Sequence, residues 1–233
     1  MRLLRDDYVS VHKNPLPWQP LLHMTVDPAC GGYGSSFALV TFCFLPDGEC
    51  LLVGGEEIGA SSDTDRKAAI LNHIDALRAR TEFSGCKIVF CVESNLGAEA
   101  ENYCNFIRER NVPKIIIVRE DKDRDGWRTT NETKKLGVIR MNAVLNDKRL
   151  KFYKHMIRVT SKDAEDTAAK LRNTIIDQLQ SFMRIIVPVK NPWDDTKEKF
   201  SGKLSGRDDL CVAVQMALLV FERVKGRRDV YNL

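Results

Sequence analysis

The chain has 233 residues, of which 43% are hydrophobic and 29% are charged, a composition typical of soluble globular domains. A chain of this length can bury a substantial core, so one large domain is expected. No apolar run approaches the roughly 20 residues that span a bilayer, and the first residues lack the apolar stretch of a signal peptide. We therefore expect a protein that is neither secreted nor embedded in a membrane.

Cysteine and histidine usage narrows the kinds of catalytic site. There are seven cysteines and four histidines, with no Cys-x-x-Cys pair and no His/Cys pair at zinc-ligand spacing. Cys43, Cys91 and Cys211 lie in apolar runs, which predicts buried, reduced thiols. The histidines are scattered, so neither a histidine-based metal site nor a Ser-His-Asp triad is supported.

Positive charge is concentrated in one segment. The net charge of the chain is +4, but residues 119–158 hold twelve Lys/Arg against six Asp/Glu, a net of +6 that leaves about −2 for the remainder. Such a segment suits a polyanionic partner such as nucleic acid. A solvated loop and helix face explains the same charges equally well.

The start of the chain predicts an extended lead-in and then three strands. Residues 1–20 are polar and spaced by prolines, with Trp18 as an apolar anchor. Strands and turns are then expected to alternate as strand 21–26, glycine-rich turn 31–34, strand 36–45, turn 46–48 and strand 50–58. Short turns join antiparallel neighbours, so the three strands are expected to form an antiparallel meander.

The hydrophobic period then changes to helices that alternate with buried strands. Helices are expected at 64–80 and 98–110, and continuous apolar runs predict buried strands at 87–92 and 114–118. Ser62 and Asp63 are both suitable N-caps for the first of these helices.

The second half begins with a polar, irregular stretch from residue 119. The elements expected after it are helix 133–146, a short strand 150–153, helix 164–183, strand 184–189, a charged flexible connection 191–206 and an apolar helix 208–224. The domain is expected to run from 21 to 226, with a short tail at 227–233.

Carboxylates stand where two of the predicted strands end. Val26 is followed by Asp27, and Val92 is followed by Glu93. A third group, Asp208–Asp209, opens the last helix. Ligands gather at the carboxyl ends of strands in α/β sheets, and carboxylate oxygens suit Mg²⁺ or Mn²⁺. Two such ions can promote phosphodiester cleavage.

Each carboxylate also has a structural explanation when it is taken alone. Asp27 precedes a proline and can start a turn, and Glu93 can cap the following helix. Asp208 and Asp209 can complement the dipole of the helix they open. The joint pattern of an acid ending the first strand, an acid ending the fourth and an acid pair opening the last helix is far less common.

This order of elements and acids resembles the ribonuclease H-like arrangement. More narrowly, the chain resembles the C-terminal nuclease domain of the terminase large subunit, the DNA-packaging motor of herpesviruses and tailed phages. The motifs that carry the resemblance are Thr25-Val-Asp-Pro-Ala29, Phe90-Cys-Val-Glu-Ser-Asn95 and Ser201-Gly-Lys-Leu-Ser-Gly-Arg-Asp-Asp-Leu-Cys-Val-Ala213. The fold class that this implies is α/β, a mixed sheet of an antiparallel meander plus parallel strands, flanked by helices.

The resemblance implies a two-metal-ion endonuclease that cuts concatemeric viral DNA during packaging into capsids. By this analogy, Asp27 bridges two Mg²⁺ or Mn²⁺ ions, while Glu93 and one of Asp208 or Asp209 bind one each. The implied partners are double-stranded DNA, the terminase ATPase motor, other terminase subunits and the capsid portal. The implied location is the host nucleus for a herpesvirus or the bacterial cytoplasm for a phage. No G-x-x-x-x-G-K-[ST] phosphate loop occurs, so the packaging ATPase is expected elsewhere.

Several basic residues are candidates for sequence-independent contacts with DNA phosphates. They are Lys122, Arg124, Arg128, Lys134 and Lys135 after the predicted strand 114–118, and Lys203 and Arg207 before the acid pair. Trp127 can stack on a base, although a half-buried aromatic is the better explanation.

Two other functions remain open on these residues. A Holliday-junction resolvase or a transposase uses similar carboxylates and differs in its substrate. A catalytically idle module that docks DNA or capsid proteins would not need the carboxylates at all. An actin-like kinase or ATPase is disfavoured, because the glycine motifs that bind phosphate are missing.

Overall fold

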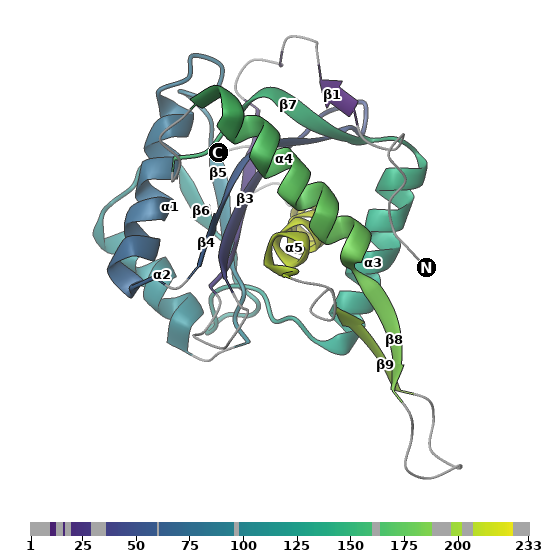
Figure 1. The fold of residues 1–233 in the computed structure, drawn as a ribbon. Helices are drawn as coiled ribbons and strands as arrows, with labels where there is room; N and C mark the ends of the chain where they lie inside the picture. The colour runs from purple at the N-terminus through teal and green to yellow at the C-terminus, as the bar shows by residue number, and fades with distance from the viewer. Residues whose placement is uncertain are drawn as a thin grey trace.

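The computed structural model describes residues 10–12, 16, 20–28, 36–59, 61–95, 98–159, 164–187, 197–201 and 207–225. The expected glycine turn at 31–34, Lys203 and the expected tail at 227–233 lie outside these residues. A seven-stranded mixed sheet forms the centre of the described part, in the order β1-β7-β4-β3-β2-β5-β6 (Figure 1).

The first half of the chain folds as its hydrophobic pattern predicts. Its elements are β2 (Leu22–Asp27), β3 (Phe37–Phe44), β4 (Cys50–Ile58), α1 (Asp63–Arg78), β5 (Ile88–Val92), α2 (Ala98–Glu109) and β6 (Ile115–Ile117). Strands β2, β3 and β4 pair antiparallel, which confirms the meander, whereas β5 pairs parallel with β2 and β6. Ser62 is the N-cap of helix α1, and its side chain accepts the backbone N–H of Asp65 in a capping box.

The second half differs from the sequence prediction at two places, and the lead-in of the chain differs at a third. Its elements are α3 (Asn131–Asn146), β7 (Leu150–Ile157), α4 (Ala164–Ser181), β8 (Met183–Val187), β9 (Lys197–Ser201) and α5 (Asp209–Val224). Strand β7 is twice the expected length and pairs parallel with β4. Strand β1 (Ser10–His12), within the expected lead-in, pairs parallel with β7. Part of the connection expected to be flexible forms β9, which pairs antiparallel with β8.

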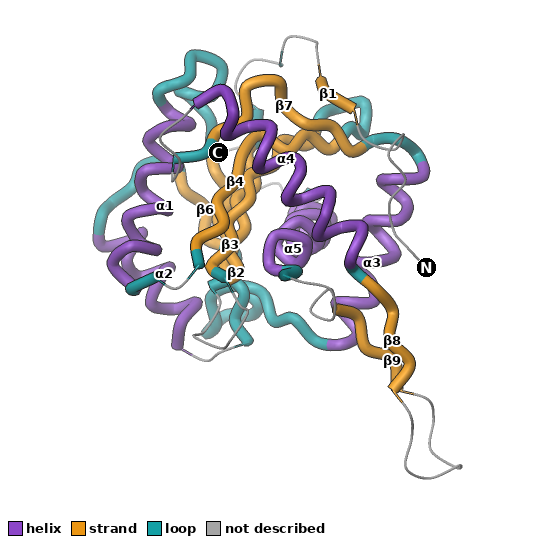
Figure 2. The backbone as a smooth tube through the Cα atoms, in the orientation of Figure 1, coloured by secondary structure: helices purple, strands orange, loops and turns teal. Residues whose placement is uncertain are grey.

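Helices cover both faces of the sheet, and clusters of buried apolar side chains lie between the helices and each face. Helices α1 and α2 lie on one face, and α3, α4 and α5 lie on the other (Figure 2). Helix α5 crosses β2 and β3 and packs beside α3 and α4, and twelve of its sixteen residues are buried. This explains why its sequence is apolar on nearly every side.

The cysteines behave as the sequence predicts. Six of them fall within the described residues, and all six are buried free thiols. Among the described helices, none has the length and apolar character needed to cross a membrane.

Candidate active site

Two acidic residues meet where the parallel strands β2 and β5 end. Val26 pairs with Val92, and the backbone N–H of Glu93 donates to the carbonyl of Val26 at 2.8 Å. Asp27 and Glu93 therefore stand side by side at the same edge of the sheet. Alternation along each strand places them on the α5 face, since Thr25 bonds to α5 and Cys91 packs with α5 residues. Both carboxylates are largely buried, at 8% and 7% exposed.

Helix α5 begins above this edge and adds the acid pair. The Thr25 hydroxyl donates to the carbonyl of Ala213 at 2.8 Å, which holds the helix close to β2. Asp209 Oδ2 accepts the backbone N–H of Ser36 at 2.9 Å, just before β3 starts. Asp208 Oδ2 accepts the hydroxyl of Ser201 from β9 at 3.1 Å. Asp209 is thus bonded to the edge of the main sheet, whereas Asp208 is bonded to the β8–β9 hairpin.

A further carboxylate, Glu57 on β4, reaches the same edge. Asp27 pairs with Ala38, and Ala38 pairs with Glu57 on its other side, so all three side chains project from the α5 face. Burial raises the pKa of Glu57, the negative charge of Asp209 raises it further, and a hydrogen bond from Gln178 opposes the rise. Arg207 also lowers the pKa of Glu57, which places this exposed cation near Glu57.

Asn95 connects Glu93 to the basic segment of the chain. Its amide nitrogen donates to Glu93 Oε1 at 2.9 Å, and its amide oxygen accepts the backbone N–H of Thr129 at 2.8 Å. Gly126 brings the same segment against β5 with φ +92°, and a Cβ at this position would lie only 2.3 Å from the carbonyl oxygen of Val92. No side chain fits there, so glycine permits this close approach.

A polar groove of about 550 Å³ opens beside Ser94 and Asn95. Three of the predicted DNA-binding residues, Lys122, Arg124 and Arg128, line it. Arg119 and Arg108 line it as well, and Arg108 forms two hydrogen bonds with Asp125 at 2.6 and 2.7 Å. The groove therefore brings excess positive charge next to the Glu93 end of the site.

Three other predicted basic residues, Lys134, Lys135 and Arg207, do not line this groove. Lys134 is half-buried near the start of α3 and lines a small hollow with Trp127 and Gln215. Lys135 is exposed on the same helix. Trp127 is half-buried beneath the guanidinium of Arg223, 5.4 Å from the ring centroid, as expected.

The donor set at this edge fits a hard divalent ion. Asp27, Glu93 and Asp209 supply only carboxylate oxygens, which Mg²⁺ and Mn²⁺ prefer over nitrogen and sulfur ligands. Within the described part of the chain, no three His, Cys, Asp or Glu side chains are grouped closely enough to bind one ion together.

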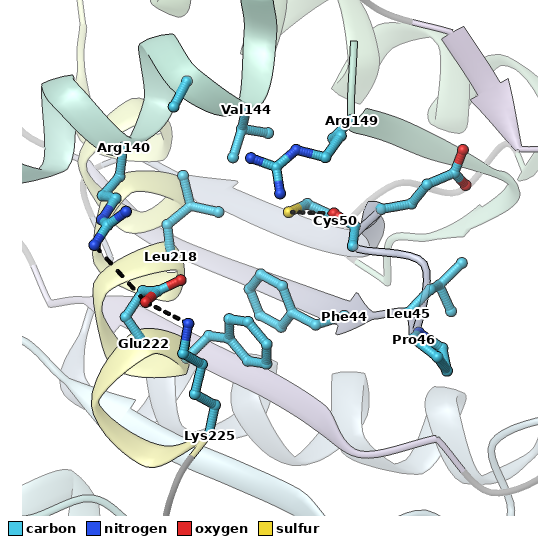
Figure 3. Close-up of a pocket in the computed structure, with 14 residues that line it drawn as sticks. Phe44, Leu45, Pro46, Cys50, Arg140, Val144, Arg149, Leu218, Glu222 and Lys225 are labelled. Atoms are coloured by element: carbon cyan, nitrogen blue, oxygen red, sulfur yellow. Dashed lines mark hydrogen bonds and ion pairs between the residues drawn. The ribbon is translucent and has the colours of Figure 1, made fainter. Parts of the chain in front are cut away.

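A second pocket, of about 510 Å³, lies at the opposite end of β3 (Figure 3). Its floor includes Phe44, which stacks on Phe221 at 3.9 Å between ring centroids. On its rim, Glu222 forms ion pairs with Arg140 and Lys225 (Figure 3). None of the acidic residues predicted for the site lines this pocket.

Sequence reasoning missed Glu57 and Gln178 and assigned no role to Asn95. A usable signal existed for Glu57, because the third predicted strand also ends in acids, Glu56 and Glu57. Alternation in a strand sends two adjacent side chains to opposite faces. The structure bears this out, since Glu56 bonds to buried His73 of α1 on the opposite face.

No protein-family model matches the sequence, and no curated protein matches it either. Among solved structures, the human cytomegalovirus terminase nuclease domain, manganese-soaked and inhibitor-bound, matches with a TM-score of 0.63 and 16% identity, over 87% of this chain and 83% of that one. A manganese-soaked structure of that domain gives a TM-score of 0.59 and 17% identity, over 86% and 82%. The large terminase of bacteriophage HK97 gives a TM-score of 0.51 and 8% identity, over 94% of this chain and 43% of that one. The chain therefore has the ribonuclease H-like fold of the terminase nuclease domains, as its sequence motifs predict.

Proposed function

We propose that this chain is a metal-dependent endonuclease that cuts double-stranded DNA with little sequence preference. The observation that carries the proposal is the meeting of Asp27 and Glu93 at the ends of neighbouring parallel strands, beneath the start of α5. The likeness to terminase nuclease domains supports a nuclease, and two of those structures were soaked with manganese.

Asp27, Glu93 and Asp209 are the residues proposed to hold two Mg²⁺ or Mn²⁺ ions. Asp209 is preferred over Asp208 because it is bonded to the start of β3, next to the Asp27 edge, while Asp208 is bonded to the β8–β9 hairpin. When bound, such ions supply Lewis-acid stabilisation of the attacking and leaving oxygens of a phosphodiester. The role of the chain is to fix the carboxylates through backbone and side-chain hydrogen bonds.

The proposed DNA contacts follow from the charged groove. Lys122, Arg124 and Arg128 line the groove beside Asn95 and face away from the buried core. Contacts with phosphates position a duplex without reading its sequence. Lys134, Lys135 and Arg207 remain proposed DNA contacts, and so does Lys203, which lies outside the described residues.

The proposed setting is viral genome packaging. The likeness to the HK97 large terminase and to a herpesvirus terminase domain supports the proposal that this chain acts together with an ATPase motor, other terminase subunits and a capsid portal. The corresponding locations are the host nucleus for a herpesvirus and the bacterial cytoplasm for a phage. Because these partners would control when DNA is cut, we expect the isolated chain to cleave DNA only weakly.

Cleavage of supercoiled plasmid in Mn²⁺, Mg²⁺ or EDTA tests the proposal. The variants are Asp27→Asn, Glu93→Gln, Asp208→Asn and Asp209→Asn, and the control is Asp47→Asn in the turn at the far end of β3. We expect metal-dependent nicking and linearisation by the wild type and by Asp47→Asn, and none by Asp27→Asn, Glu93→Gln or Asp209→Asn.

Three results would count against parts of the proposal. Cleavage that survives Asp27→Asn would remove the carboxylates from the reaction. A strong preference for four-way junctions over plain duplex would favour a resolvase. A folded wild type that neither cuts DNA nor binds Mn²⁺ by calorimetry would favour a docking module.

A further inference from the structure

Gln178 of α4 accepts hydrogen bonds from backbone N–H groups in the first turn of α5. The first backbone N–H groups of a helix have no partner within the helix. Here the amide oxygen of Gln178 accepts the N–H of Leu210 at 2.9 Å and the N–H of Cys211 at 3.2 Å. Asp208 occupies the N-cap position but makes no capping hydrogen bond with its side chain. A residue from another helix therefore caps α5.

Glu57 holds Gln178 in the orientation that capping needs. The amide nitrogen of Gln178 donates to Glu57 Oε1 at 2.8 Å. Gln178 is only 5% exposed, so its amide has little access to water as a substitute partner. The reversed amide would turn its NH₂ group toward two backbone N–H donors and its oxygen toward a carboxylate, and both contacts would be repulsive.

This chain of contacts ends at a proposed metal ligand. Asp209 precedes Leu210, so fixing the first turn of α5 fixes the direction from which Asp209 approaches β3. Glu57 stands two strands from Asp27 on the same face. The sheet and the helix are thereby tied together at the edge where the carboxylates gather.

We propose that Glu57 is a positioning residue of the candidate nuclease site, which acts through Gln178 to fix the start of α5 and so the carboxylate of Asp209. The inference rests on the proposed function for the role of Asp209. The hydrogen-bonded relay from Glu57 through Gln178 to Leu210 and Cys211 is independent of the proposed function.

Four variants separate the relay from a direct metal ligand. Glu57→Ala removes the acceptor, whereas Glu57→Gln keeps an oxygen that can accept from Gln178. Gln178→Met removes the cap, and Asn173→Leu at an exposed position of the same helix is its control. Amide hydrogen exchange of Leu210 and Cys211 reports the relay, and calorimetric binding of Mn²⁺ without DNA reports the site.

We expect the two amides to exchange about tenfold faster in Gln178→Met and Glu57→Ala, because each loses a hydrogen bond of the relay. Exchange in Glu57→Gln and Asn173→Leu should stay close to wild type. Mn²⁺ affinity should fall about tenfold in the first two variants, which is the usual effect of losing a residue that orients a ligand. Glu57→Gln should retain Mn²⁺ binding.

The two readouts distinguish the ways in which the inference can fail. Unchanged amide exchange in Glu57→Ala would overturn the relay. Faster exchange with unchanged Mn²⁺ affinity would overturn its link to Asp209. Loss of Mn²⁺ binding in Glu57→Gln equal to that in Glu57→Ala would make Glu57 a direct ligand instead. A wild type that binds no Mn²⁺ would refute the proposed function. Amide hydrogen exchange of Leu210 and Cys211 would then still test whether the relay exists.

Discussion

At the scale of single residues, side-chain amides are the connectors of the candidate site. Asn95 bonds to Glu93 with its nitrogen and to the backbone of Thr129 with its oxygen. The polarity is the same as at Gln178, where the nitrogen faces a carboxylate and the oxygen faces backbone N–H groups. An amide suits this task, because it offers a donor and an acceptor on one planar group.

Replacing Asn95 with alanine should weaken metal binding more than it weakens folding. Glu93 would lose the donor that fixes its orientation, and the loss of such a partner typically lowers metal affinity by about 10- to 100-fold. The control is Asn105→Ala, because Asn105 is exposed on α2 and bonds only locally to Arg108. Calorimetric titration with Mn²⁺ measures the effect, and equal affinities for the two variants would contradict it.

Single residues also show how much of the candidate site could be predicted from the sequence. Asp27 and Glu93 could be predicted, because each ends an apolar run and the strand order then brings them together. Glu57 required the register of two strand pairs, Asp27 with Ala38 and Ala38 with Glu57. Gln178 required the packing of α4 on α5. Such contacts depend on tertiary structure and leave no periodic trace in the sequence.

At the scale of elements, α5 is the part that joins the sheet to the acid pair. Ala213 and Ala217 are fully buried where the helix crosses the sheet. Their small side chains let the helix backbone come close enough for the Thr25 hydroxyl to bond to the carbonyl of Ala213 at 2.8 Å. The spacing of four residues places both alanines on one face of the helix.

Enlarging this face should destabilise the protein. Ala217→Leu adds three carbons to a closed interface, and overpacking of this kind costs about 1–3 kcal/mol. Ala143→Leu makes the same change on α3, where the side chain lines the open pocket at the far end of β3, and should alter stability by no more than about 0.5 kcal/mol. Urea unfolding of both variants gives the comparison, and similar losses would argue against close packing of α5.

The elements that the sequence prediction missed are the ones without a hydrophobic period. Strand β1 has three residues, which are too few to show an alternating pattern. Strand β9 reads Lys-Glu-Lys-Phe-Ser and looks like a charged loop. Strand β7 alternates only over its first four residues, after which Lys154 and His155 are exposed and the last two residues are both buried. In each case backbone pairing with a neighbouring strand, not side-chain pattern, establishes the strand.

At the scale of the whole molecule, one buried histidine should make stability depend on pH. His23 in β2 is 1% exposed and lies edge-on to Phe44 at 5.0 Å and Phe221 at 5.5 Å between ring centroids. Burial lowers the pKa of His23 from 6.5 to about 3. The unfolded chain therefore binds a proton at His23 below pH 6.5 that the folded chain refuses until about pH 3.

Stability should accordingly fall as the pH is lowered from about 6.5 towards 3, with a contribution from His23 of at most about 1.4 kcal/mol per pH unit. His23→Phe keeps an aromatic ring but cannot take up a proton. The difference between wild type and His23→Phe in the free energy of unfolding isolates this contribution from the carboxylates, which titrate in both. Parallel pH profiles for the two proteins would show that His23 does not remain neutral in the fold.

The distribution of charge predicts which side of the molecule would make the proposed DNA contacts. Lys122 and Arg128 line the groove beside Ser94 and Asn95, whereas Lys87, which precedes β5, and Arg110, which follows α2, do not line it. Each phosphate that a cation neutralises releases counterions, so the logarithm of affinity falls with the logarithm of salt by about 0.9 per contact.

Removing two groove cations should therefore flatten the salt dependence of DNA binding by up to about 1.8 in this slope. The double variant Lys122→Gln/Arg128→Gln should show that change, and Lys87→Gln/Arg110→Gln should not, although both lower the net charge equally. Fluorescence anisotropy of a labelled duplex across a salt series in EDTA, where cleavage is blocked, measures both slopes. Because phosphate contacts carry no base information, the loss should be the same for unrelated duplexes. Equal slopes for the two double variants would mean that net charge, and not the groove, attracts the DNA.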